Sequence, residues 1–185
     1  MHCASIASAL SLTLLVAAPA RADVVTLSPD HDNTMFGEDG TLSNGAGDYL
    51  FAGTTDAREL RRGLLSFDIA AGVPAGATIT AVTLSLYMSR AKSNNLYDVS
   101  LHRVTASWGE GTSHAAGEEG AGIAATTGDA TWSHRRYDTQ TWTSPGGDYE
   151  ARPASTSANA STERRAAASA CAIAPAEPFR SASTR

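Results

Sequence analysis

Residues 61–90 read RRGLLSFDIAAGVPAGATITAVTLSLYMSR, and this stretch decides the fold class. Two segments within it alternate between apolar and polar positions. Their apolar faces are Leu65, Phe67 and Ile69 in the first segment and Thr80, Val82, Leu84, Leu86 and Met88 in the second. Alternation with a period of two is typical of a β-strand with one buried face. We therefore expect two strands, joined through the turn-forming sequence VPAG at residues 73–76.

The chain on either side of this stretch continues the same pattern. Short apolar segments are separated by Gly, Asn, Asp and Pro, and no helical stripe appears between residues 23 and 150. Many short strands divided by turn signals predict an all-β fold, an antiparallel β-sandwich or jelly roll. A chain of 185 residues is long enough for one such domain and too short for two of ordinary size.

The amino terminus has the pattern of an export signal. Residues 6–18 are mostly apolar, and Ala20-Arg21-Ala22 supplies the small-x-small sequence that precedes cleavage. We expect a signal peptide at residues 1–22 and a secreted, extracellular protein. The apolar run falls short of the roughly 20 residues that a bilayer span needs, so we expect no membrane-embedded segment. Cleavage would leave Cys171 alone, without an internal disulfide partner.

The carboxyl-terminal segment differs from the rest in composition. Residues 151–185 contain 12 Ala and 6 Ser, a single aromatic residue and no alternating apolar run. Such a segment buries too little apolar surface to offset the entropy lost on ordering. We therefore expect a folded domain at residues 23–150, followed by a disordered tail at residues 151–185.

The charge of the chain is unevenly distributed. Residues 23–150 hold 8 Lys or Arg against 17 Asp or Glu, a net charge of −9, whereas residues 151–185 hold 5 against 2, a net charge of +3. Nucleic acid rewards clustered positive charge. The acidic body of the protein therefore excludes nucleic acid as an expected partner.

Acidic and amide side chains gather just before the predicted strands. The sequence DHDN at residues 30–33 is followed by Glu38 and Asp39. Carboxylates and amide oxygens are the ligands that Ca²⁺ takes. The candidate ligands for a structural calcium ion are Asp30, Asp32, Asn33 and Asp39. The competing interpretation is a solvated loop in which these side chains serve turns.

Aromatic residues concentrate between residues 101 and 149, a stretch that holds all three tryptophans. Flat aromatic rings stack on the C–H faces of sugars, while neighbouring polar groups bind the hydroxyls. The candidate ligand-binding residues are Trp142, Tyr137, His134, Arg135, Trp132 and Trp108. For Trp108 and Trp132 the sequence favours packing in the core or at its rim. Trp142, within TQTWTSPGG, has a loop-like context and is expected to be exposed.

Three segments taken together resemble a known family. These are residues 61–90 quoted above, LHRVTASWGEGTS at 101–113 and GDATWSHRRYD at 128–138. Their order resembles that of secreted bacterial proteins of the DNRLRE-domain group, which carry an Arg-Leu-Leu-x-Phe-Asp strand, a Pro-x-Gly-Ala-Thr-Ile turn and a Trp-x-Glu-Gly loop. The resemblance covers about residues 30–149. It implies a β jelly roll similar to carbohydrate-binding modules, exported and often attached to enzymes or surface proteins.

The chain departs from that group after Tyr149. Members continue with further strands, whereas here the Ala/Ser/Arg-rich segment follows. A frameshift or truncation would explain the change, and we therefore expect an incomplete sandwich with unpaired strand edges.

These observations predict a secreted, non-catalytic module that binds a polysaccharide or a cell-surface glycan. One alternative is a structural or adhesive component of an extracellular matrix. The other is a polysaccharide lyase or glycoside hydrolase. The neighbours Ser113 and His114 do not define a catalytic triad, because geometry rather than sequence order makes one. No catalytic residue is assigned.

Overall fold

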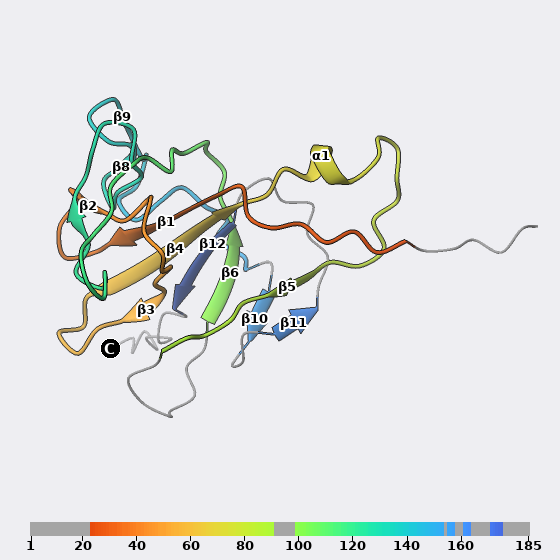
Figure 1. Cartoon of the computed structure of the whole chain (residues 1–185), viewed down its shortest axis with the longest axis horizontal. Helices are drawn as coiled ribbons and strands as arrows, with labels where there is room; N and C mark the ends of the chain where they lie inside the picture. Colours follow the sequence, from red (N-terminus) through yellow and green to blue (C-terminus); the bar gives the residue numbers. More distant parts are fainter. Residues whose placement is uncertain (1–22, 91–98, 154, 158–160, 164–170, 176–185) are drawn as a thin grey trace, which may run out of the picture.

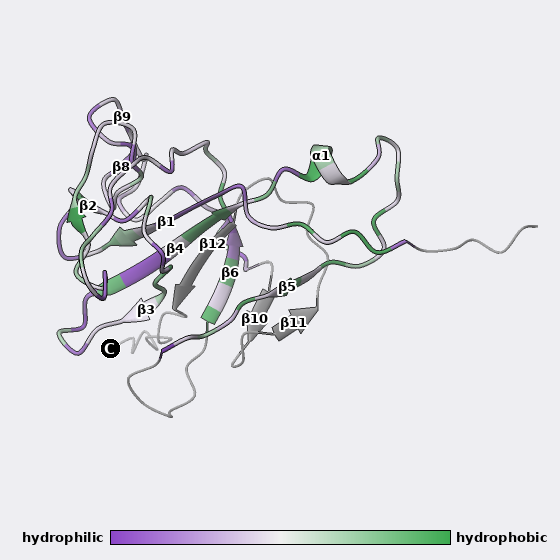
Figure 2. Cartoon of the chain, in the orientation of Figure 1, coloured by the Kyte–Doolittle hydropathy of each residue, from purple (hydrophilic) through white to green (hydrophobic). Residues whose placement is uncertain are grey.

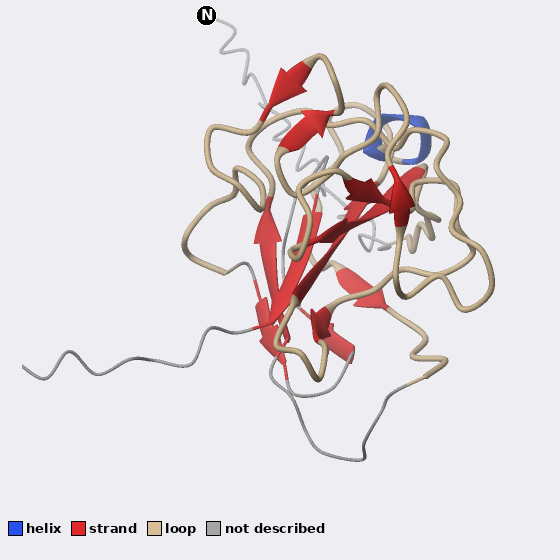
Figure 3. Cartoon of the chain, turned by 90° about the vertical axis from the view of Figure 1, so that its left-hand side faces the viewer, coloured by secondary structure: helices blue, strands red, loops and turns tan. Residues whose placement is uncertain are grey.

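The computed structural model describes residues 23–90 and 99–153, and the backbone of three further strands at 155–157, 161–163 and 171–175 (Figure 1). The predicted signal peptide lies outside the described residues. Within them, strands dominate and one short helix, α1 (Ile69–Gly72), is present (Figure 3). The expectation of an all-β chain is confirmed. No helix in the described part is long and apolar enough to cross a membrane.

A six-stranded antiparallel sheet forms the main body (Figure 1). Its strands lie in the order β1 (His31–Phe36), β4 (Leu60–Ser66), β12 (Cys171–Pro175), β6 (Val99–Arg103) and β10 (Ser155–Ser157), with β3 (Gly53–Thr54) also paired to β4. In the β1–β4 pair, Asn33 lies opposite Leu64 and His31 lies opposite Ser66. This register brings the start of β1 and the end of β4 to one end of the sheet.

Three smaller antiparallel pairs surround this sheet. They are β2 (Leu42–Ser43) with β7 (Ile123–Ala124), β5 (Thr83–Ser85) with β11 (Ser161–Glu163), and β8 (His134–Arg136) with β9 (Gln140–Thr141). The pairing of β2 with β7 joins segments about eighty positions apart in the chain, Leu42 lying opposite Ala124. The long Gly-rich stretch after β6 is therefore folded back over the amino-terminal part of the domain.

Strands form at both alternating segments, but their bounds differ from those expected: the first begins earlier, at Leu60, and the second is shorter. The first ends at Ser66 because Asp68 caps α1, its Oδ1 accepting a hydrogen bond from the Ala71 amide at 3.0 Å. The second, expected over residues 79–88, is limited to β5, which pairs with the three-residue strand β11. Beyond it Tyr87 and Met88 are 93% and 70% exposed, so Met88 does not belong to the core face.

The segment that the sequence predicts to be disordered contributes strands β10, β11 and β12. Strand β12 lies between β4 and β6, with Ala172 paired to Leu64 on one side and to His102 on the other. Strands can form in this Ala/Ser-rich segment because a sheet ladder is made by backbone amide and carbonyl groups, whatever the side chains are. Without this strand the facing edges of β4 and β6 would be unpaired in the sheet.

Apolar side chains pack on both faces of β4, since consecutive residues of a strand point to opposite sides. Leu64 belongs to the cluster of Met35, Val104, Ala130 and Trp142, with Ala106, Trp108 and Trp132 packed against it. Leu65 on the other face contacts Leu50, Phe67, Leu84, Leu86, Val99 and Leu101. Figure 2 shows the apolar half of β4 continuing from its charged half, where Arg61 and Arg62 lie. Burying one leucine contributes roughly 1.5–3 kcal/mol.

Asn33 is a polar residue of β1 that is fully excluded from solvent. Its Nδ2 donates to the Glu110 carbonyl at 2.7 Å, to Ser43 Oγ at 2.9 Å and to the Ala130 carbonyl at 3.3 Å. Its Oδ1 accepts from the Asn44 amide at 3.2 Å. One side chain therefore attaches three loop segments to the sheet.

Replacing Asn33 with Asp tests this attachment. The change puts an acceptor where Nδ2 now faces two buried carbonyls, so we expect Asn33→Asp to lower the free energy of unfolding by about 2–4 kcal/mol. Urea unfolding followed by circular dichroism measures it. The matched control is Gln140→Glu, an amide-to-acid change at an exposed position, with an expected effect under about 0.5 kcal/mol. Equal midpoints for Asn33→Asp and the control would contradict the role of Asn33.

Candidate functional site

A groove of about 600 Å³ lies where the start of β1 and the ends of β4 and β6 meet. This volume is within the range of small-ligand pockets. The residues that line it include His31, Ser66, Arg103, Trp108, Glu110 and Arg136, together with residues 104–107 and Gly109. Each of β1, β4 and β6 contributes a terminal residue, so the sheet register builds the groove.

Trp108 provides the aromatic surface of the groove. The indole is half-buried and packs against the Leu64 cluster, and the residue also lines the groove. The His31 ring lies edge-on to it, with the ring centroids 6.4 Å apart and an interplanar angle of 81°. The indole is therefore held in place by the core, which is what a stacking surface requires.

Charged side chains at the groove are fixed by hydrogen bonds. Glu110 Oε1 accepts from the Asp32 amide at 3.0 Å. Arg136 Nη2 donates to the Trp108 carbonyl at 3.3 Å. Arg103 Nε donates to Glu150 Oε1 at 2.9 Å. Burial, together with the nearby charge of Glu110, raises the pKa of Asp32 above its ordinary value.

The expectation that Trp142 is exposed is wrong. The residue follows β9 and is only 5% exposed, packed in the cluster that contains Met35 and Leu64. Its Nε1 donates to the Thr131 carbonyl at 2.9 Å, which satisfies the indole N–H within the protein. The loop-like residues around it predict a turn correctly, but they do not say which way the side chain points. Trp142 therefore belongs to the core and not to a ligand-binding surface.

The other predicted ligand-binding residues lie in and around β8. Trp132 is half-buried, with the Arg62 guanidinium 4.8 Å from its ring centroid. His134 and Tyr137 meet edge-to-face at 5.2 Å. Arg135 Nη1 donates to the Ser107 carbonyl at 3.0 Å and so lies near one wall of the groove. Of the six predicted residues, Trp108 is the one that lines the groove.

The four candidate calcium ligands are spread from the residue before β1, through the strand, to the turn after it. Asn33 uses its carboxamide in the buried network described above. Asp39 Oδ1 accepts from the Thr41 hydroxyl at 2.7 Å and from the Thr41 amide at 2.9 Å, and these bonds lower the pKa of this exposed carboxyl. Asp30 Oδ2 lies 3.0 Å from His31 Nδ1, and Asp32 is half-buried beside Glu110. Within residues 23–90 and 99–153, the acidic and histidine side chains that gather closely enough to hold an ion lie elsewhere.

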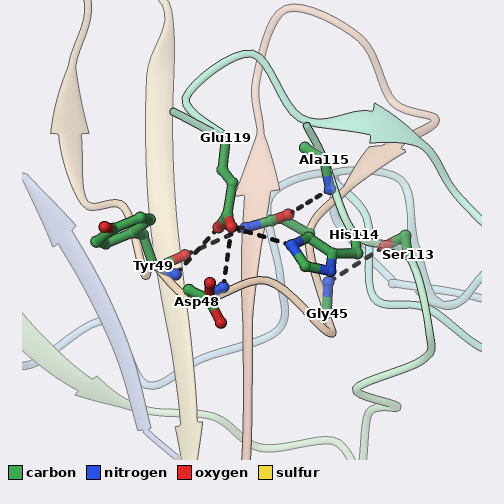
Figure 4. Close-up of polar contacts among 8 residues, drawn as sticks. Gly45, Asp48, Tyr49, Ser113, His114, Ala115 and Glu119 are labelled. Carbon is green, nitrogen blue, oxygen red and sulfur yellow. Dashed lines mark hydrogen bonds and ion pairs between the residues drawn. The ribbon is translucent and has the colours of Figure 1, made fainter. Parts of the chain in front are cut away.

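That other cluster is centred on Glu119, a loop residue that is only 4% exposed (Figure 4). Its Oε2 accepts from Asn44 Nδ2 at 2.8 Å and from the Tyr49 amide at 3.0 Å. Its Oε1 accepts from the Asp48 amide at 3.1 Å and lies 3.2 Å from His114 Nε2. Burial raises the pKa of Glu119, but these hydrogen bonds and His114 outweigh it and the pKa is lowered overall.

Further hydrogen bonds join the loops on which this cluster lies. The Ala46 amide donates to the Ser113 carbonyl at 2.7 Å, and Ser113 Oγ accepts from the Gly45 amide at 3.2 Å (Figure 4). Ser113 is itself only 3% exposed. Its hydroxyl therefore connects two loops.

Sequence reasoning did not identify several residues of these sites. Glu110 lies two positions after Trp108 in the Trp-x-Glu-Gly loop, and this short spacing could have indicated that the two residues share a site. His31 and Arg103 are more than seventy positions apart in sequence. Asn44 and Asp48 are likewise distant from Glu119. These groups meet through long-range strand and loop contacts, which local patterns do not reveal.

No family model, curated protein or solved structure matches the chain.

Replacing Glu119 with Gln tests the loop attachment. An amide nitrogen would then face donors that now bind an oxygen, so we expect a loss of about 1–3 kcal/mol in the free energy of unfolding. The matched control is Glu118→Gln. Glu118 and its partner Arg90 are 74% and 72% exposed, and an exposed ion pair contributes little. Urea unfolding measures both, and an unchanged midpoint for Glu119→Gln would contradict the attachment.

Proposed function

We propose that the protein is a secreted, non-catalytic module of DNRLRE-like jelly-roll architecture, which binds a polysaccharide or a cell-surface glycan in the groove beside Trp108. The observation that carries this proposal is the groove itself, which combines a half-buried indole with fixed polar side chains. The signal-like sequence of residues 1–22 supports the extracellular location.

The chemistry of the groove suits a sugar. An indole face offers apolar contact to the C–H groups of a pyranose ring, and neighbouring donors and acceptors bind its hydroxyls. Arg103 and Arg136 supply donors, whereas Glu110 supplies acceptors. Since these groups are held by other contacts, less side-chain entropy is lost when a ligand binds.

The arrangement of carboxylates favours binding over hydrolysis. Among the described residues that line the groove, Glu110 carries the only carboxylate side chain. Glycoside hydrolysis generally needs two, about 5–9.5 Å apart across the scissile bond. Asp32 lies beside Glu110, but it contributes no surface to the groove.

A structural or adhesive role is the second candidate, and one observation favours it. Tyr87 and Met88 are neighbouring large apolar residues that are 93% and 70% exposed. Exposed apolar surface can mark a contact with another molecule. They lie apart from the groove, so the two roles can be separated by mutation.

Affinity electrophoresis in gels that contain different polysaccharides tests glycan binding. We expect the wild-type protein to be retarded by at least one glycan, and Trp108→Ala to lose most of this retardation because the stacking surface is gone. Glu110→Gln keeps the size of the side chain and should weaken binding several-fold. Tyr87→Ala is the matched aromatic control and should bind like wild type. Thermal melting checks that the variants fold, since Trp108 also packs on the core.

Three results would contradict this proposal. Equal retardation of wild type, Trp108→Ala and Glu110→Gln would exclude the groove as the binding site. Absence of glycan binding, together with self-association that Tyr87→Ala abolishes, would favour the structural role. Release of reducing ends or unsaturated products, lost in Glu110→Gln, would show catalysis.

A further inference from the structure

Asp48, His114 and Glu119 converge where the loop after β2 meets the loop after β6 (Figure 4). Each offers one ligand atom, and the three atoms all lie within 4.8 Å of one another. None of the three residues lines the Trp108 groove. The cluster therefore forms a separate arrangement that glycan binding does not use.

The spacing of two of these atoms matches that of ligands on one small cation. His114 Nε2 lies 3.2 Å from Glu119 Oε1. Zinc binds imidazole nitrogen and carboxylate oxygen at about 2.0–2.2 Å, and in a tetrahedral site two such ligands lie roughly 3.3–3.6 Å apart. A cation bound by both atoms would therefore require only a small adjustment of their positions.

The Glu119 carboxylate is held in position by the surrounding loop. Three N–H groups, from Asn44, Asp48 and Tyr49, donate to its two oxygens. Hydrogen bonds of this kind orient ligating carboxylates in metal sites. Oε1 accepts from the Asp48 amide with one lone pair. Its other lone pair faces His114 and is the one that can bind an ion.

The other two ligands are accessible from solvent. The His114 side chain is 54% exposed, and Asp48 is exposed. Within the described part of the chain, the carboxylate of Asp48 has no hydrogen-bond or ion-pair partner, although its backbone amide is bound to Glu119. An ion can thus enter from solvent, and water can complete its coordination.

We propose that Asp48, His114 and Glu119 bind one divalent transition-metal cation, with Zn²⁺ as the best fit. One imidazole with two carboxylates suits zinc, whereas Ca²⁺ and Mg²⁺ take oxygen ligands alone. The bound ion joins the loop of Asp48 to the loop of His114 and Glu119. Because it binds the folded chain and not the unfolded one, it stabilises the fold.

The test is a zinc titration of the full, tag-free chain after treatment with a chelator. We expect isothermal titration calorimetry to give one site per chain, and the melting temperature to rise with zinc concentration. His114→Ala and Asp48→Asn should each weaken zinc binding at least tenfold and remove the rise in melting temperature. Both residues are exposed, so these variants are expected to fold. Glu118→Gln, an acidic neighbour outside the cluster, should behave like wild type.

Absorption of Co²⁺ in place of Zn²⁺ provides a readout that does not depend on stability. Absorption bands of bound Co²⁺ in the visible range should appear when Co²⁺ is added to the wild-type chain, and they should be absent for His114→Ala. Unchanged zinc affinity in either His114→Ala or Asp48→Asn would overturn the three-ligand site. So would stabilisation by Ca²⁺ that equals or exceeds stabilisation by Zn²⁺. Trp108→Ala should bind zinc normally, which separates this test from that of glycan binding.

Discussion

The buried carboxamide of Asn33 is the interaction on which the rest of the described structure depends. Strand β1 is buried on both faces over residues 33–36, and at position 33 it carries an amide that is fully excluded from solvent. The cost of burying it is offset because its donors and acceptor are bonded to Ser43, Asn44, Glu110 and Ala130. These bonds bring the loop of Glu110 to the start of β1, and the groove beside Trp108 lies at that junction.

The same principle orders the long Gly-rich segment after β6, which contains few strand residues. Asp129 is fully buried, and its carboxylate accepts from the amides of Thr112 at 2.7 Å and Thr126 at 2.6 Å. Gly111 has φ +80°, and a Cβ at this position would lie 1.4 Å from Asp129 Oδ1. Polar side chains that bind backbone groups therefore give this segment a defined shape, as Glu119 does for the neighbouring loop.

Arg62 shows how a buried charge shapes the aromatic region. It is 8% exposed, its guanidinium lies 4.8 Å from the Trp132 ring and 5.1 Å from the Tyr149 ring, and its Nη1 donates to the Gly146 carbonyl at 2.7 Å. This cation holds Trp132 against the core cluster. With Trp142 also buried, Trp108 is the tryptophan that lines the groove. Which tryptophan can contact a ligand is therefore determined by core packing and not by the composition of the surrounding loop.

The sequence by itself predicted the all-β character of the described residues, since short apolar segments divided by turn residues are a local property of the sequence. It also indicated that Trp108 and Trp132 pack in the core or at its rim. It did not determine which tryptophan is buried most deeply, which polar groups meet at the groove, or that β12 lies between β4 and β6. Tertiary structure decided these points, because exposure and hydrogen bonding depend on contacts between residues seventy or more positions apart, and no local pattern encodes them.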